Sequence, residues 1–188
     1  MATKKQYTTI EVAGGEVRLS SPATSTGASS RSRTSPRSAR ENARLSSPPS
    51  DLIIRPCRRG ELVAVLDLWA ESRSQYATTR DDVDAVERVI ERDPSSLLIA
   101  ERGAGLIGTV VAAWDGWRGN MYRLAVAVEE RRSGVGLALV RAGEAHLRER
   151  GARRVTALVG SEDDGAVALW EAAGYVHDRY VTRFVKNL

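Results

Sequence analysis

The chain of 188 residues contains one cysteine, Cys57, and two histidines. A single thiol excludes a disulfide-stapled fold, and so few cysteines and histidines exclude a Cys-rich zinc site or a Cys/His metal cluster. No apolar run is long enough to cross a bilayer, and the N-terminus lacks the apolar stretch of a secretory signal. These absences predict a cytoplasmic protein with no metal and no membrane partner.

The net charge of +4 is unevenly distributed along the chain. Residues 1–50 carry eight basic and three acidic side chains, a balance of +5. The rest of the chain carries 20 basic and 21 acidic side chains and is close to neutral. The basic isoelectric point therefore belongs to the N-terminal part, and nucleic-acid binding is expected only through that part.

Composition also separates the first 50 residues from the remainder. Residues 20–50 are rich in Ser, Arg and Pro and hold almost no large apolar side chains, so they cannot bury enough surface to offset the entropy of ordering. Residues 7–19 alternate around a Gly-Gly turn and predict a short hairpin. We expect 1–50 to be a disordered tail, acting as a linker or as a contact for nucleic acid or an acidic protein, and 51–188 to be a folded domain.

Residues 51–188 show the periodicities of a mixed fold. Apolar residues at helical spacing predict helices at 61–72, 81–92, 134–150 and 164–173. Runs rich in β-branched residues predict strands at 52–56, 97–101, 106–114, 121–128, 155–159 and 175–185. This order indicates an α/β (α+β) fold, in which a mixed sheet carries helices on both faces.

The segment Arg131-Arg132-Ser133-Gly134-Val135-Gly136 joins a predicted apolar strand to a predicted helix. The first turn of a helix has unpaired N–H groups and a partial positive charge, and glycine lets an anion approach the backbone closely. The two arginines add positive charge. The segment therefore predicts an anion-binding loop suited to a diphosphate.

The loop admits other interpretations. A dinucleotide site would have a third glycine where Leu139 stands, and a nucleotide P-loop would have Gly-Lys-Ser/Thr, which is missing. The structural alternative is a glycine turn that only closes a strand–helix junction.

Motifs on either side favour acyl-CoA binding. The loop fits the pattern Arg/Gln-x-x-Gly-x-Gly/Ala, and Leu169-Trp170-Glu171-Ala-Ala-Gly174-Tyr175 follows at the right separation. Ile54-Arg55-Pro56 and the strand from Tyr122 to Val126 precede it in order. Residues 52–188 thereby resemble the GCN5-related N-acetyltransferase (GNAT) family, near the bacterial ribosomal-protein acetyltransferases. The resemblance implies a mostly antiparallel central sheet.

The resemblance also implies the chemistry. An amine, on a small molecule or a protein N-terminus, would attack the thioester of acetyl-CoA directly in a ternary complex. The Val126 N–H would stabilise the charge that develops on the thioester oxygen, and Tyr122 and Trp170 would be the side chains nearest to catalysis. The expected contacts of acetyl-CoA are Leu124, Ala125, Val126, Arg131, Arg132, Ser133, Gly134, Val135, Gly136 and Asp163.

Two positions depart from the family pattern. Trp170 stands where the family commonly has a tyrosine as general acid, and an indole cannot deliver a proton at neutral pH. Asp163 stands where an asparagine often contacts the pantetheine arm. Either the thiolate leaves without a dedicated acid, or the domain is a non-catalytic module that binds or senses acyl-CoA.

The sequence leaves the general base open and gives neither the acceptor nor the oligomeric state. Tyr122 is one candidate, and His146 is expected at the surface or edge of its helix. Glu129 and Glu130 are candidates whose alternative is a solvated rim, and the remaining candidates are Glu162 and His177.

Overall fold

The computed structural model describes residues 7–12, 15–20, 51–72 and 81–186. The chain divides into two compact units, Met1–Pro36 and Arg37–Leu188. In the first unit, β1 (Tyr7–Val12) and β2 (Gly15–Ser20) pair as an antiparallel hairpin. The predicted disorder of 21–50 lies outside the described residues.

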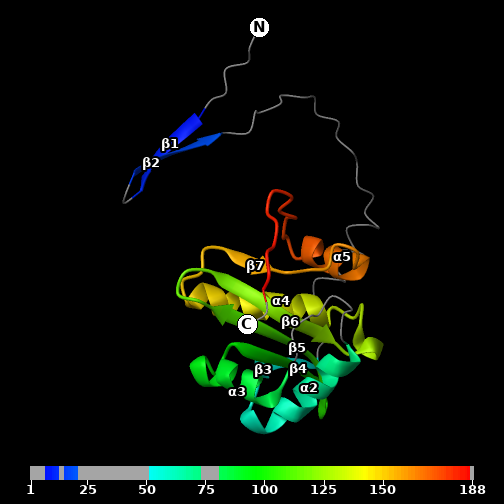
Figure 1. Ribbon diagram of the computed structural model, residues 1–188. Coiled ribbons are helices and arrows are strands. Elements are labelled where there is room, and N and C mark those ends of the chain that lie inside the picture. Colours follow the sequence, from blue (N-terminus) through cyan, green and yellow to red (C-terminus); the bar gives the residue numbers. More distant parts are fainter. Residues whose placement is uncertain (1–6, 13–14, 21–50, 73–80, 187–188) are drawn as a thin grey trace. The chain divides into compact units, whose positions relative to one another are not determined.

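The second unit contains a five-stranded sheet of order β3-β4-β5-β6-β7, with every pair antiparallel except β6 and β7 (Figure 1). This confirms the predicted mixed, mostly antiparallel α/β fold. The strands are β3 (Leu52–Pro56), β4 (Leu97–Arg102), β5 (Gly105–Trp114), β6 (Gly119–Val126) and β7 (Val155–Ala157). The helices are α2 (Leu62–Glu71), α3 (Val83–Arg92), α4 (Val135–Glu149) and α5 (Asp164–Ala172), with short 3-10 turns η1 (Arg59–Glu61) and η2 (Val128–Glu130).

Alternation along the strands builds a core on each face of the sheet. Leu98 and Ala100 of β4 join the cluster that contains α4 residues and Trp170. Leu97 and Ile99 point the other way, into the cluster formed with α2 and α3. Because successive strand residues face opposite sides, the continuous apolar run of β4 shows that helices cover both faces.

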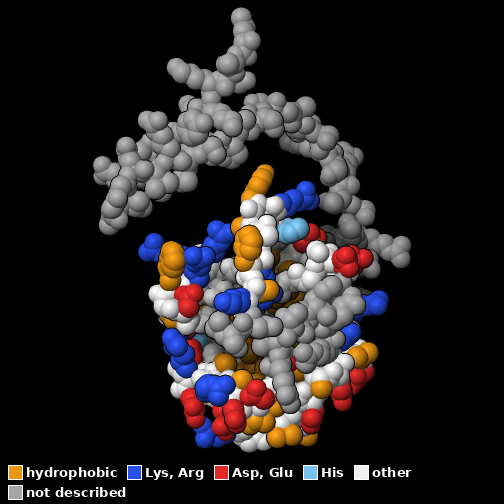
Figure 2. Space-filling view, in the orientation of Figure 1, with side chains coloured by type: hydrophobic (Ala, Val, Ile, Leu, Met, Phe, Trp, Pro, Cys, Tyr) orange, Lys and Arg blue, Asp and Glu red, His pale blue; other side chains and the backbone are white. Residues whose placement is uncertain are grey.

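The predicted final strand at 175–185 is wrong. The described residues from 175 to 186 contain no helix or strand, and Val176, Tyr180 and Phe184 are each at least 90% exposed. Figure 2 shows hydrophobic side chains standing out from this part of the surface. The alternating pattern gives strand propensity only, and a strand also needs a partner edge; β7, with three paired residues, provides little of one.

Within the ranges that the structure describes, no helix combines the length and the apolar character needed to span a membrane.

Candidate active site

Strand β6 extends beyond its pairing with the edge strand β7. Gly119, Asn120 and Met121 lie opposite the three residues of β7. After Met121, no described strand pairs with β6 on that side. The stretch from Tyr122 to Val126 is thus an open edge, bonded to β5 on one side only.

The backbone of Val126 faces this open edge. The next residue, Ala127, donates its N–H to the carbonyl oxygen of Ile107, which precedes Gly108 of β5, at 2.9 Å. Since N–H groups alternate in direction along an antiparallel strand, the Val126 N–H points away from β5. The Val126 carbonyl points the same way and accepts a bond from Arg131 Nε at 3.2 Å.

A β-bulge interrupts β6 within this edge. Thr109 lies opposite Ala125, but Val111 lies opposite Tyr122, so β6 contains one residue more than β5 between these pairs. Arg123, within the bulge, has a φ of 51°, a backbone conformation that residues other than glycine rarely adopt.

Side chains hold the bulge in place. The Thr109 hydroxyl donates to the Arg123 carbonyl at 3.1 Å and accepts from Trp69 Nε1 at 2.7 Å. The Arg123 guanidinium forms an ion pair with Asp81 at 2.5 Å. Sequence reasoning did not identify these residues, because the partners are 14 to 42 residues apart and no local motif joins them.

Helix α4 begins at Val135, after η2 and the loop of residues 131–134. Asp82 caps α3 by accepting from Ala85 N, and Asp163 caps α5 by accepting from Ala166 N. No side chain caps α4, whose N-cap, Gly134, has a φ of 88°. Its first N–H groups are therefore not taken by a capping side chain, as the anion-binding loop requires.

The two glycines at this helix start have different surroundings. A Cβ atom added to Gly134 would meet nothing within 4 Å. One added to Gly136 would lie 2.9 Å from Leu169 Cδ1 and 3.7 Å from Val126 Cγ2. Glycine at 136 thus lets the first turn of α4 pack against both α5 and the end of β6, and this brings the predicted loop and Val126 together.

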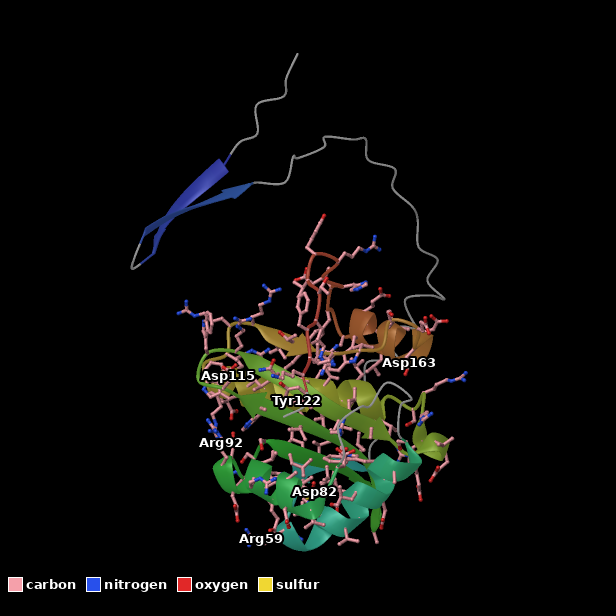
Figure 3. The ribbon with its side chains drawn as sticks, viewed as in Figure 1. Arg59, Asp82, Arg92, Asp115, Tyr122 and Asp163 are labelled. Atoms are coloured by element: carbon pink, nitrogen blue, oxygen red, sulfur yellow. The ribbon has the colours of Figure 1, made fainter. Side chains whose placement is uncertain are left out.

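Tyr122 lies on the open edge with 43% of its surface exposed. Partial burial, with a further contribution from Asp115, raises the pKa of Tyr122. Its hydroxyl is therefore protonated at neutral pH and can donate a proton. Figure 3 labels Tyr122 on strand β6 and Asp163 at the start of helix α5.

Trp170 lies in the core, not at the surface of the site. It is 8% exposed and packs edge-on against Tyr175, with ring centroids 4.8 Å apart. Asp163 uses its carboxylate as the α5 cap, at 3.0 Å from Ala166 N. Both residues therefore have structural contacts that are independent of any ligand.

The candidate bases differ in their surroundings. Glu130 forms an ion pair with Arg102, while Glu129, Glu162 and His177 are exposed. The expectation that His146 lies at the helix surface is wrong, because it is 9% exposed and its Nε2 lies 3.1 Å from Asp93 Oδ2. Helical periodicity alone did not show that Asp93, at the C-terminus of α3, places its carboxylate beside His146.

Among the residues that the structure describes, no three His, Cys, Asp or Glu side chains come together as a metal site.

The chain is similar to known acetyltransferases. Residues 61–175 match the model of the acetyltransferase (GNAT) family. An acetyltransferase of Pectobacterium atrosepticum, ECA0875, is 30% identical over 122 residues, which cover 65% of this chain and 86% of that protein.

Solved structures share the fold. A ribosomal-protein-alanine N-acetyltransferase from Brucella melitensis superposes with a TM-score of 0.56 at 21% identity, covering 65% of this chain and 83% of that one. AAC(6')-Iy, in complex with the bisubstrate analogue CoA-S-monomethyl-acetylneamine, gives a TM-score of 0.60 at 19% identity, covering 74% of this chain and all of that one. At these identities the likeness extends to the fold alone.

Proposed function

This chain belongs to the acetyltransferase (GNAT) family and is an acyltransferase, and on that basis we propose that residues 51–188 transfer an acetyl group from acetyl-CoA to a primary amine. One observation carries the proposal. The Val126 N–H faces the open edge of β6, and the uncapped start of α4 packs against the same residue.

In this proposal two backbone surfaces bind acetyl-CoA. The amides of residues 131–136 hold the diphosphate, with the positive charge of Arg131 and Arg132 nearby. The backbone of Leu124 and Val126 pairs with the pantetheine arm as an added strand would. Arg131 already bonds to the Val126 carbonyl, so a pantetheine amide would take over that acceptor.

The chemical step is a direct acyl transfer. The amine nitrogen forms a bond to the thioester carbon and releases its proton to water, and the carbon–sulfur bond breaks to give the thiolate of CoA. The Val126 N–H stabilises the oxygen on which negative charge develops. We assign the Tyr122 hydroxyl, on the same open edge, as the donor that protonates the thiolate.

Turnover of the purified full chain tests this function. Acetyl-CoA is mixed with a panel of small primary amines and of peptides with free N-termini, while free thiol is followed and products are identified by mass. Amine-dependent thiol release with an acetylated product supports the proposal. Failure to bind acetyl-CoA would contradict it.

The second candidate is a non-catalytic acyl-CoA-binding module. Trp170, in the place of the usual tyrosine, favours it, since an indole supplies no proton and this one is buried against Tyr175. Its expected result is tight CoA binding without turnover of any amine. In that case Trp170→Tyr is informative, because a gain of activity would attribute the defect to the missing acid.

A further inference from the structure

Thr109 is the best-buried polar residue next to the open edge. It lies on β5 with 0% of its surface exposed. A buried hydroxyl needs hydrogen-bond partners, and a threonine can donate one bond and accept others. Here it accepts from Trp69 Nε1 at 2.7 Å and donates to the Arg123 carbonyl at 3.1 Å. The indole bond fixes the direction in which the hydroxyl proton points.

The carbonyl that Thr109 binds belongs to the bulge. The extra residue in β6 shifts the register of the β5–β6 ladder at this carbonyl. The hydroxyl of Thr109 donates to this carbonyl from the neighbouring strand. This bond fixes the peptide group between Arg123 and Leu124.

The orientation of that peptide has a consequence on its other side. No described peptide bond is cis, and in a trans peptide the C=O and the N–H point in opposite directions. Because the Arg123 carbonyl is drawn towards Thr109, the Leu124 N–H points away from β5. It therefore lies on the same side as the Val126 N–H, two residues further along the open edge.

A second anchor keeps Arg123 in its unusual conformation. Its guanidinium pairs with Asp81, which precedes α3, and lies 5.7 Å from the centre of the Trp69 ring. Trp69 thus contacts both the hydroxyl and the guanidinium. Trp69 of α2 and Asp81, just before α3, therefore hold the bulge. Both residues are distant along the chain from the loop of residues 131–136.

We propose that Thr109 is a positioning residue for acyl-CoA: its hydroxyl orients the Arg123–Leu124 peptide so that the Leu124 N–H meets the pantetheine arm. The inference rests on the proposed function, since it concerns the same substrate. In this inference, a buried side chain that does not touch the substrate sets the geometry of one half of the binding edge.

Two variants of the full chain separate this role from a general effect on folding. Thr109→Val removes the hydroxyl at nearly constant shape, and Thr109→Ser keeps it. The two ligands are acetyl-CoA and 3′-phospho-ADP, the part of CoA that lacks the pantetheine arm, and dissociation constants come from calorimetry. We expect Thr109→Val to weaken acetyl-CoA about tenfold and to leave 3′-phospho-ADP within twofold of wild type. Thr109→Ser should bind both ligands within twofold of wild type.

Two results would overturn the inference: unchanged acetyl-CoA affinity in Thr109→Val, or an equal loss of both ligands. If Thr109→Val does not fold, Trp69→Phe decides, because it keeps the hydroxyl and removes the group that orients it. That variant should weaken acetyl-CoA selectively, and wild-type affinity in it would overturn the inference. A wild-type chain that binds no acetyl-CoA would instead contradict the proposed function.

Discussion

Gly108 lies directly opposite Val126 in the antiparallel ladder between β5 and β6. A Cβ atom at Gly108 would come 2.9 Å from Leu139 Cδ1, 3.1 Å from the Ala125 carbonyl oxygen and 3.2 Å from Val135 Cγ1. Only one of these neighbours is the end of a flexible side chain. The close approach of β5, the end of β6 and the first turn of α4 therefore depends on the missing side chain at this position.

Gly108→Ala should loosen this junction. We expect a loss of about 1–3 kcal/mol in the free energy of unfolding, because the added methyl group forces backbone and core side chains to shift. Acetyl-CoA affinity should fall as well, since both proposed binding surfaces move. Denaturant unfolding and calorimetry measure the two effects. Gly105→Ala is the matched control, because its nearest neighbour is 3.6 Å away; equal losses in both variants would contradict the prediction.

The anion-binding loop can be tested at the two ends of one helix. Gly134 and Gly151 flank α4, have φ values of 88° and 91°, and have no atom within 4 Å of an added Cβ. Glutamate at either position costs about 1–2 kcal/mol of backbone strain and adds the same charge. Only Gly134→Glu should lose CoA binding, by tenfold or more, because its carboxylate repels the diphosphate. Similar CoA affinities in the two variants would count against the loop.

Tyr122→Phe tests the proposed proton donor. We expect kcat to fall at least tenfold, while the KM for acetyl-CoA changes little, because the ring stays and only the transferable proton is lost. Steady-state kinetics at saturating amine measures both. Tyr180→Phe serves as the control, since this tyrosine is fully exposed outside the site. An unchanged kcat in Tyr122→Phe would remove Tyr122 from the mechanism.

Much of this arrangement was predictable from local patterns. The strand, glycine loop and helix from Tyr122 to Glu149 follow from apolar periodicity and the Gly134 and Gly136 positions, and the structure confirms these elements. The family resemblance supplied the expected role of Val126, which stays a prediction. These features depend on neighbours in sequence, which a single chain displays directly.

What the sequence could not provide depends on distant pairs. The bond between Trp69 and Thr109 joins residues 40 apart, and the pair of His146 with Asp93 joins residues 53 apart. Neither has a local pattern. The final strand failed for the same reason, since an alternating segment predicts a strand but not whether an edge pairs with it. The bulge at Arg123 also has no glycine to indicate its positive φ.

Acid stability should depend on Glu61, whose carboxylate binds the Arg55 guanidinium at 2.5 Å. The bonds from Arg55 lower the pKa of Glu61 from 4.5 to about 2. A lowered pKa means that this contribution to stability is complete above pH 4.5 and is lost as the pH falls towards 2. Glu61→Gln should therefore cost about 1 kcal/mol at pH 7, given the solvent access of the pair, and much less at pH 2.5.

Urea unfolding at both pH values measures this difference. Glu71→Gln is the control, because Glu71 is exposed at the end of α2 and its substitution leaves the Arg55 pair intact. A cost of Glu61→Gln that is the same at pH 7 and pH 2.5 would show that the ion pair does not set the acid sensitivity.

The basic N-terminal part should be separable from catalysis. Residues 1–50 carry a charge of +5, the rest of the chain is nearly neutral, and the family match begins at residue 61. We therefore expect a chain of residues 51–188 to fold and to release thiol from acetyl-CoA at the rate of the full chain.

Any binding of the full chain to RNA or DNA should weaken steeply with salt, through release of counterions, and should vanish on truncation. Fluorescence anisotropy with a labelled oligonucleotide at several salt concentrations measures it. Undiminished affinity in the truncated chain would place the nucleic-acid contact on the folded domain, and a loss of thiol release would show that the tail takes part in the reaction.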